Sequence, residues 1–303
     1  MTDEVAALPD ATAVMAALNR AAHLVLDSLP HVFVDDVGLR LVNVPAVLRH
    51  AGFDVPEVAA ELRADGWLFG PRALEWFRGW RGTFVARARF VEELVVDHVG
   101  RGVDQVVLLG AGLDTMALRR VDLQGRVVVF EVDQPATQRW KQQRIHQLFG
   151  ASPVNLRFVP VDFETTTSWH APLVEVGFAT DRPSLIVSAG VTQYITEQAF
   201  AATLNVIASL PVGTTFACTF IVPAESTASN DRELRAVTEQ RAAERGAPWI
   251  SFYEPGDLVD MARAASFAAV EHVSPTSWND QWFKRRTDGL RASSAEHALV
   301  ATR

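Results

Sequence analysis

The sequence predicts an α/β fold in which a mostly parallel sheet of seven strands carries helices on both faces. Short, wholly apolar runs recur from residue 106 onward, and segments of helical length and pattern separate them. Such runs are typical of strands buried on both faces, and their alternation with helices is typical of a parallel sheet. No linker, internal repeat or low-complexity tract interrupts the chain, so we expect one domain over residues 1–303.

Residues 1–85 are expected to form a helical cap ahead of the sheet. Apolar residues recur there at roughly helical spacing, as Met15, Leu18 and Ala22 illustrate. Prolines divide the region into short helices, and they stand at Pro30, Pro45, Pro56 and Pro71. The core that contains the sheet then covers residues 86–303.

Seven strands are expected within this core. They cover residues 106–109, 127–130, 156–161, 185–187, 215–222, 268–273 and 298–302. Residues 223–256, between the fifth and sixth strands, are predicted to be an insertion with a loop-like start and a helix at 231–246. An insertion at this place could cover a site.

Composition and charge exclude several classes of protein. The 28 basic and 36 acidic residues give a net charge of -8, which argues against nucleic acid or an anionic membrane surface as partner. Cys218 is the only cysteine and the histidines lack metal-ligand spacing, so we expect neither an intrachain disulfide nor a metal site. The chain shows no secretory signal and no long apolar span, so we expect a soluble, cytoplasmic protein.

The strongest local motif is a glycine turn directly after the first expected strand. Its residues are Leu109-Gly110-Ala111-Gly112-Leu113-Asp114. Glycine permits a tight turn and lets the backbone approach a ligand closely. Because ordinary strand-to-helix turns also contain Gly-x-Gly, the motif predicts a ligand site only together with its surroundings.

Acidic residues end the next two strands. Glu131 and Asp133 stand 19 and 21 positions beyond Gly112, where a carboxylate can accept hydrogen bonds from ribose hydroxyls. Asp162 could accept a hydrogen bond from an adenine amino group while Phe163 packs on the ring. Because the carboxyl ends of parallel strands line one crevice, these residues predict a nucleoside site.

The turn favours S-adenosyl-L-methionine over a nicotinamide cofactor. A nicotinamide dehydrogenase would show a third glycine where this chain has Thr115. Asp114 would repel a pyrophosphate, but it would tolerate the sulfonium and ammonium groups of S-adenosyl-L-methionine.

Taken in order and spacing, several motifs resemble the leucine carboxyl methyltransferase family, including its bacterial branch of secondary-metabolite O-methyltransferases. Besides the glycine turn through Thr115, they are Arg87-Ala88-Arg89-Phe90, Phe130-Glu131-Val132-Asp133-Gln134-Pro135 followed by Lys141, Val161-Asp162, and Ala189-Gly190-Val191 followed by Tyr194-Ile195-Thr196. The resemblance implies a Rossmann-like class I methyltransferase fold with an antiparallel final strand.

The resemblance also implies roles for single residues. Arg87 would hold the carboxylate of the cofactor, and Asp133 would hold its ribose, with Glu131 on the same face of the strand. Arg20 is a further candidate for a contact with the cofactor. Ala189, which we also place in the cofactor site, stands where better-studied members have a glutamate, and this difference favours a small-molecule acceptor over a protein carboxylate.

The acceptor is expected under a lid made by the cap and the insertion. Trp76, Tyr194 and Tyr253 are the candidate acceptor contacts. They belong to a larger set of aromatic residues that includes Trp67, Phe69, Phe77, Trp80, Trp249 and Phe252. A pocket walled by such residues would suit an apolar small molecule.

We expect O-methylation, with a carboxylate favoured over a hydroxyl. A carboxylate is already ionised near pH 7 and needs no general base, whereas a hydroxyl does. His23, His31 and His170 are the candidate bases for a hydroxyl acceptor, and no motif fixes any of them. The alternative is a binding protein that keeps the crevice without transferring a methyl group, and a nicotinamide oxidoreductase stands third.

Overall fold

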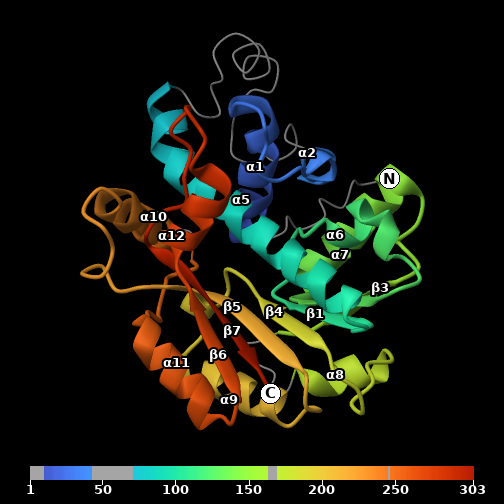
Figure 1. Ribbon diagram of the computed structural model, residues 1–303. Helices are drawn as coiled ribbons and strands as arrows, with labels where there is room; N and C mark the ends of the chain where they lie inside the picture. Colours follow the sequence, from blue (N-terminus) through green and yellow to red (C-terminus); the bar gives the residue numbers. More distant parts are fainter. Residues whose placement is uncertain (1–9, 43–70, 163–168, 245) are drawn as a thin grey trace.

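The computed structural model describes residues 10–42, 71–162, 169–244 and 246–303 (Figure 1). Three residues named above, Trp67, Phe69 and Phe163, lie outside the described residues. For Trp76 and Phe77 only the backbone is described, and it belongs to a helix.

A seven-stranded sheet forms the centre of the molecule. Its strands are β1 (Gln105–Leu109), β2 (Val128–Asp133), β3 (Leu156–Pro160), β4 (Leu185–Ser188), β5 (Thr215–Ile221), β6 (Ala269–Val273) and β7 (Glu296–Thr302). Their order is β3-β2-β1-β4-β5-β7-β6. The first five strands pair in parallel, and β7 is antiparallel to both of its neighbours. The seven predicted strands and the antiparallel final strand are therefore confirmed.

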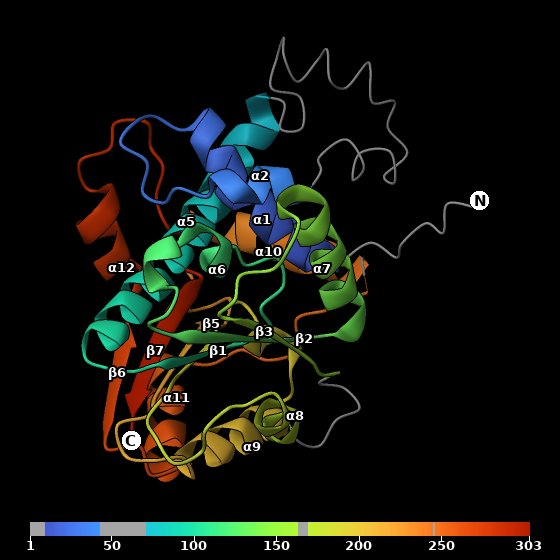
Figure 2. The same cartoon turned by 90° about the vertical axis from the view of Figure 1, so that its right-hand side faces the viewer.

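Helices cover both faces of this sheet (Figure 2). The first face carries α1 (Ala11–Leu26), α2 (Asp36–Val42), α5 (Pro71–Gly100), α6 (Met116–Arg119), α7 (Pro135–Phe149) and α10 (Arg232–Glu244). The second face carries α8 (His170–Glu175), α9 (Glu197–Ala208) and α11 (Pro255–Ala264). Short helical segments complete the fold: η2 (Val121–Leu123), η3 (Thr192–Tyr194), α12 (Pro275–Trp278) and the π-helix η4 (Asn279–Phe283). None of the helices in the described residues is long and apolar enough to cross a membrane.

Residues at the helix starts explain several of these boundaries. The side chain of Asp10 accepts a hydrogen bond from the Thr12 N–H at 2.8 Å, and it caps α1. Thr196 caps α9 in the same way. Proline occupies the first turn of α7 and of α11, where its missing N–H has no partner to lose.

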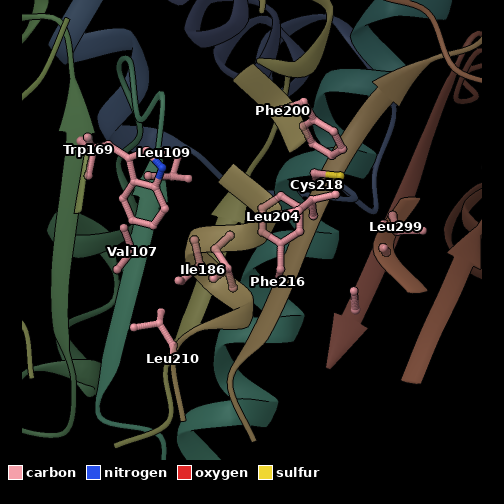
Figure 3. Packing of buried hydrophobic residues seen from close by; sticks show 14 of the residues in the cluster. Val107, Leu109, Trp169, Ile186, Phe200, Leu204, Leu210, Phe216, Cys218 and Leu299 are labelled. Carbon is pink, nitrogen blue, oxygen red and sulfur yellow. The ribbon is translucent and has the colours of Figure 1, made fainter. Parts of the chain in front are cut away.

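The apolar runs become strands that are buried on both faces. Every residue of β1 and β5 is buried. In β1, Val107 and Leu109 pack with Ile186 and Phe216 on the face of α8 and α9 (Figure 3). Val106 lies in a second apolar cluster, with α1 and α5 on the opposite face. This two-sided burial explains why the strands could be located from apolar runs alone.

Candidate active site

The glycine turn has backbone conformations that favour glycine. Gly110 and Gly112 have φ values of +68° and +51°, in the left-handed region. The Gly110 N–H donates to the Val132 carbonyl at 2.8 Å, which ties the turn to the end of β2. A Cβ on Gly112 would lie 3.1 Å from the Cβ of Ala13, so the first turn of α1 lies directly over the glycine turn.

Asp133 fastens this turn to β2. Its Oδ2 accepts a hydrogen bond from the Gly112 N–H at 2.6 Å, and its Oδ1 accepts one from the Gln134 N–H at 2.7 Å. Burial raises the pKa of Asp133, although both N–H groups act against that rise. Each carboxylate oxygen has a second acceptor position that could take a ligand hydroxyl.

Glu131 lies on the same face of β2 and has a different partner. Its side chain is 2% exposed, and its Oε2 lies 2.5 Å from Nζ of Lys141, which is 1% exposed. Burial outweighs the attraction of Lys141 and raises the pKa of Glu131 to about 7. Of the two acids, Asp133 is therefore the one whose neighbours are backbone N–H groups of the turn, and Glu131 belongs to a buried ion pair.

The remaining strand-end residues gather at the same edge of the sheet. Asp114 accepts a hydrogen bond from the Met116 N–H at 2.8 Å and thereby helps to start α6. The Val161 N–H donates to the Asp133 carbonyl at 2.9 Å, which brings the half-buried Asp162 beside the end of β2. The half-buried Ala189 follows β4, and it packs on the apolar cluster of the α1 and α5 face.

Arg87 reaches this edge from α5. Its Nη1 donates to Oε1 of Glu296 at 2.8 Å, and its Cζ lies 4.8 Å from the centre of the Phe84 ring. A Cβ on Gly190 would lie 2.5 Å from the same Nη1, so glycine at this position allows the guanidinium to approach the backbone after β4. No motif in the sequence marks Glu296, because only the pairing of β7 with β5 brings it to Arg87.

Arg20 has a structural role in the cap. Its Nε lies 3.0 Å from Oδ2 of Asp35, and its Nη2 donates to the Leu113 carbonyl at 2.8 Å. Asp35 is fully buried and also accepts a hydrogen bond from Oγ1 of Thr115 at 2.7 Å. Burial acts to raise the pKa of Asp35, but Arg20, Thr115 and Arg119 together hold it below its usual value. These contacts do not bring Arg20 into the group around Arg87.

Tyr194, a candidate acceptor contact, lies within the electrostatic influence of Arg87. Its hydroxyl accepts a hydrogen bond from Nε1 of Trp249 at 3.2 Å, and the Trp249 ring meets Trp80 of α5 edge-on at 5.8 Å. Burial raises the pKa of Tyr194, and the charge of Arg87 acts against this rise. The insertion therefore packs against α5 through aromatic side chains.

Tyr253 is not part of this group. It is 5% exposed and packs against Phe200, with ring centres 5.6 Å apart, in the core on the α8 and α9 face. The structure thus separates Tyr253 from Tyr194, although both had been expected to face the acceptor.

The sequence profile of the leucine carboxyl methyltransferase family matches residues 13–208. The chain belongs to this family. The match confirms the family that the motifs predicted, and it includes the glycine turn, Arg87, Asp133 and Tyr194.

Relatives over nearly the full length agree with this assignment. The "Putative S-adenosyl-L-methionine-dependent methyltransferase YktD" of Bacillus subtilis is 28% identical over 302 residues, covering 96% of this chain and 97% of that protein. A Mycobacterium sp. (strain KMS) protein with the same description, without the name YktD, is 31% identical over 302 residues, covering 97% and 89%. Family members of this kind identify the chain as an S-adenosylmethionine-dependent methyltransferase and confirm the expected cofactor.

Solved structures support the fold. A DUF574 family protein of Streptomyces avermitilis superimposes with a TM-score of 0.54 at 16% identity, covering 76% of this chain and 88% of that one. A "putative methyltransferase" of Thermobifida fusca gives a TM-score of 0.52 at 17% identity, covering 76% and 86%. The Rossmann-like methyltransferase fold is therefore confirmed.

Proposed function

We propose that the chain transfers the methyl group of S-adenosylmethionine to an oxygen of a small molecule, and that this oxygen belongs to a carboxylate. The supporting observation is the placement of the histidines that could have served as bases. A hydroxyl acceptor needs a base within hydrogen-bond reach, whereas a carboxylate is ionised near pH 7.

One of these histidines is committed to structural hydrogen bonds, and the other two pack against aromatic rings. His23 is fully buried, its Nδ1 bonds Asp27 at 2.8 Å, and its Nε2 accepts a backbone N–H at 2.9 Å. Burial lowers the pKa of His23, so it is neutral at pH 7 and both of its nitrogens are used. His170 packs edge-on against Phe178 on the α8 and α9 face. His31 packs edge-on against His23, which places it in the cap.

The donors and acceptors around the glycine turn fit S-adenosylmethionine. Gly112 allows close approach of the backbone, and Asp133 offers carboxylate oxygens for the ribose hydroxyls. Arg87 offers guanidinium N–H groups for the carboxylate of the amino-acid tail. We assign Gly110, Ala111, Asp114 and Ala189 to the walls of this site, Asp162 to the adenine, and Glu131 to the support of β2 next to Asp133.

The acceptor would lie beside Tyr194, under the insertion. An apolar cluster there joins α5, the end of β5, the insertion and the residue before β7. Its members are Trp80, Ile221, Leu234, Ala242, Trp249 and Ala295, with Phe84, Tyr194 and Phe252 packed against them. Its walls would select an apolar small acid and exclude water from the reacting atoms.

The contribution of the protein to the reaction is mainly alignment. The sulfonium of the bound cofactor supplies a methyl group that is intrinsically ready for transfer in line. The glycine turn, Asp133 and Arg87 fix the donor, while the aromatic wall fixes the acceptor oxygen opposite the sulfur. Alignment of this kind can lower the barrier by roughly 7–11 kcal/mol.

The test uses the purified full chain, S-adenosylmethionine carrying a radiolabelled methyl group, and paired acceptors. Each pair is a small apolar carboxylic acid and the alcohol of the same skeleton. We expect label in the acids only, released as methanol by mild base because methyl esters hydrolyse. Label in the alcohols alone would overturn the carboxylate assignment. Binding of S-adenosylhomocysteine without transfer to any acceptor would favour the binding-protein alternative.

A further inference from the structure

Glu296 is a buried acid next to the arginine that we assign to the cofactor. It is the first residue of β7, it lies opposite Ile221 at the end of β5, and its side chain is 2% exposed. Its Oε1 accepts the hydrogen bond from Nη1 of Arg87, whose side chain is 12% exposed. The pair thus lies at the edge of the sheet that carries the glycine turn.

Gly190 and Val191, which follow β4, connect this pair to the glycine turn. A Cβ placed on Gly110 would lie 2.4 Å from Cγ2 of Val191, so Val191 lies against the turn. Its neighbour Gly190 lies against the guanidinium, since a Cβ there would be 2.5 Å from Nη1 of Arg87. The Gly190 N–H donates to Oγ1 of Thr219 in β5 at 2.8 Å, which fixes this connection. A ligand bound at the glycine turn would therefore lie close to the guanidinium of Arg87 and the carboxylate of Glu296.

The pair keeps polar atoms for a ligand. A guanidinium has five N–H donors, and a carboxylate has two acceptor oxygens. Within the described part of the chain, the bond to Glu296 is the only hydrogen bond of the Arg87 side chain, and Oε2 of Glu296 has none. Phe84 covers one side of the guanidinium. The remaining N–H groups and Oε2 provide a donor and an acceptor side by side.

We propose that Glu296 binds the ammonium group of S-adenosylmethionine while Arg87 binds its carboxylate. This inference rests on the proposed function, because it extends the cofactor site defined there. The amino-acid tail carries both charges on one carbon, so a neutral Arg–Glu pair matches it better than either charge alone. Charge-assisted hydrogen bonds to both groups would select the zwitterion over a tail that carries one charge.

Calorimetric titration of the full chain tests the assignment with three ligands. These are S-adenosylhomocysteine, its analogue with the amino group replaced by hydrogen, and 5′-methylthioadenosine, which lacks the amino-acid tail. We expect the wild-type chain to bind S-adenosylhomocysteine about 10-fold or more tightly than the deaminated analogue. Glu296→Gln should remove this preference and leave the affinity for 5′-methylthioadenosine within about twofold.

Glu93→Gln is the matched control, because Glu93 is an exposed acid of α5 that pairs with Arg89. It should leave all three affinities unchanged. Equal weakening of all three ligands by Glu296→Gln would assign Glu296 a structural role and overturn the proposal. Equal binding of the first two ligands by the wild-type chain would overturn it without any variant, even if Glu296→Gln does not fold. Failure of the wild-type chain to bind any ligand would instead refute the proposed function.

Discussion

Among single residues, Glu131 and Lys141 form a buried ion pair, and we expect the replacement of either residue alone to destabilise the protein. Both side chains are almost fully buried, and their charged atoms lie 2.5 Å apart. A buried charge is tolerated when its partner remains, and it is strongly destabilising when the partner is removed. The pair therefore supports β2 directly behind Asp133, while Asp133 holds the glycine turn.

We predict that above about pH 7, where Glu131 is ionised, Glu131→Gln lowers the free energy of unfolding by about 3–5 kcal/mol, because the Lys141 charge stays buried without its partner. The double variant Glu131→Gln with Lys141→Met should lose much less than the two single variants combined. Urea denaturation of the wild-type chain and the three variants measures the coupling.

The exposed pair of Arg89 and Glu93 provides the comparison on α5. Its side chains are 47% and 39% exposed, so the same cycle should give a coupling of about 0.5 kcal/mol or less. Additive losses at Glu131 and Lys141 would mean that the two buried charges do not support each other.

The strands were the most predictable elements. The apolar run at 106–109 became β1 because both of its faces are covered, and burial of this kind leaves a mark in the local sequence. The helix expected at 231–246 was also predictable, since α10 falls within it. Local sequence patterns could not predict the contact of α10 with α5, where Nε1 of Trp80 lies 3.5 Å from the Leu234 carbonyl oxygen.

The candidate site was predictable to a different degree. The glycine turn and Asp133 lie within short motifs, so their proximity followed from the geometry of parallel strands. Glu296 and Asp35 carry no motif, and their partners stand 209 and 15 positions away in the sequence. Tyr253 is aromatic like Tyr194, and the sequence predicts that both contact the acceptor. The packing of strands and helices instead places Tyr253 in the core on the α8 and α9 face.

Asp35 joins three helical elements, and its replacement gives a prediction at this scale. It contacts Arg20 of α1, the Gly38 N–H of α2, and Thr115 at the start of α6. Asp35→Asn should destabilise the chain by about 3–5 kcal/mol, because Arg20 would lose its buried countercharge, whereas Arg119 keeps its ion pair with Glu92. Thermal and urea unfolding measure the loss, and limited proteolysis should cut the cap sooner than in the wild-type chain.

Asp122→Asn is the control for this prediction. Asp122 pairs with Arg120 in the same part of the molecule, but its side chain is 57% exposed. Water screens that pair, so its loss should cost less than about 1 kcal/mol. Equal effects of the two substitutions would show that Asp35 does not join the cap to the glycine turn.

Over the whole molecule, the cap forms hydrogen bonds with two parts of the core, one near the start of the core sequence and one near its end. Arg20 donates a hydrogen bond to the Leu113 carbonyl in the glycine turn, at 2.8 Å. At the other end, Arg286 donates to the Ser28 carbonyl at 2.7 Å, and Asp288 accepts from the Ser28 N–H at 3.0 Å. Cap contacts therefore reach the glycine turn and the segment before β7. We propose that cap and core form one cooperative unit.

If cap and core form such a unit, they should unfold together. Tryptophan fluorescence reports on the surroundings of eight tryptophans, among them Trp80, Trp249 and Trp278, whereas far-ultraviolet circular dichroism reports on all helices and strands. We expect one urea transition with the same midpoint by both probes. S-adenosylhomocysteine at 100 times its Kd should raise the free energy of unfolding by about 2.7 kcal/mol in both signals, because it binds only the folded chain. Two transitions, of which the ligand shifts only one, would show that the cap folds apart from the core.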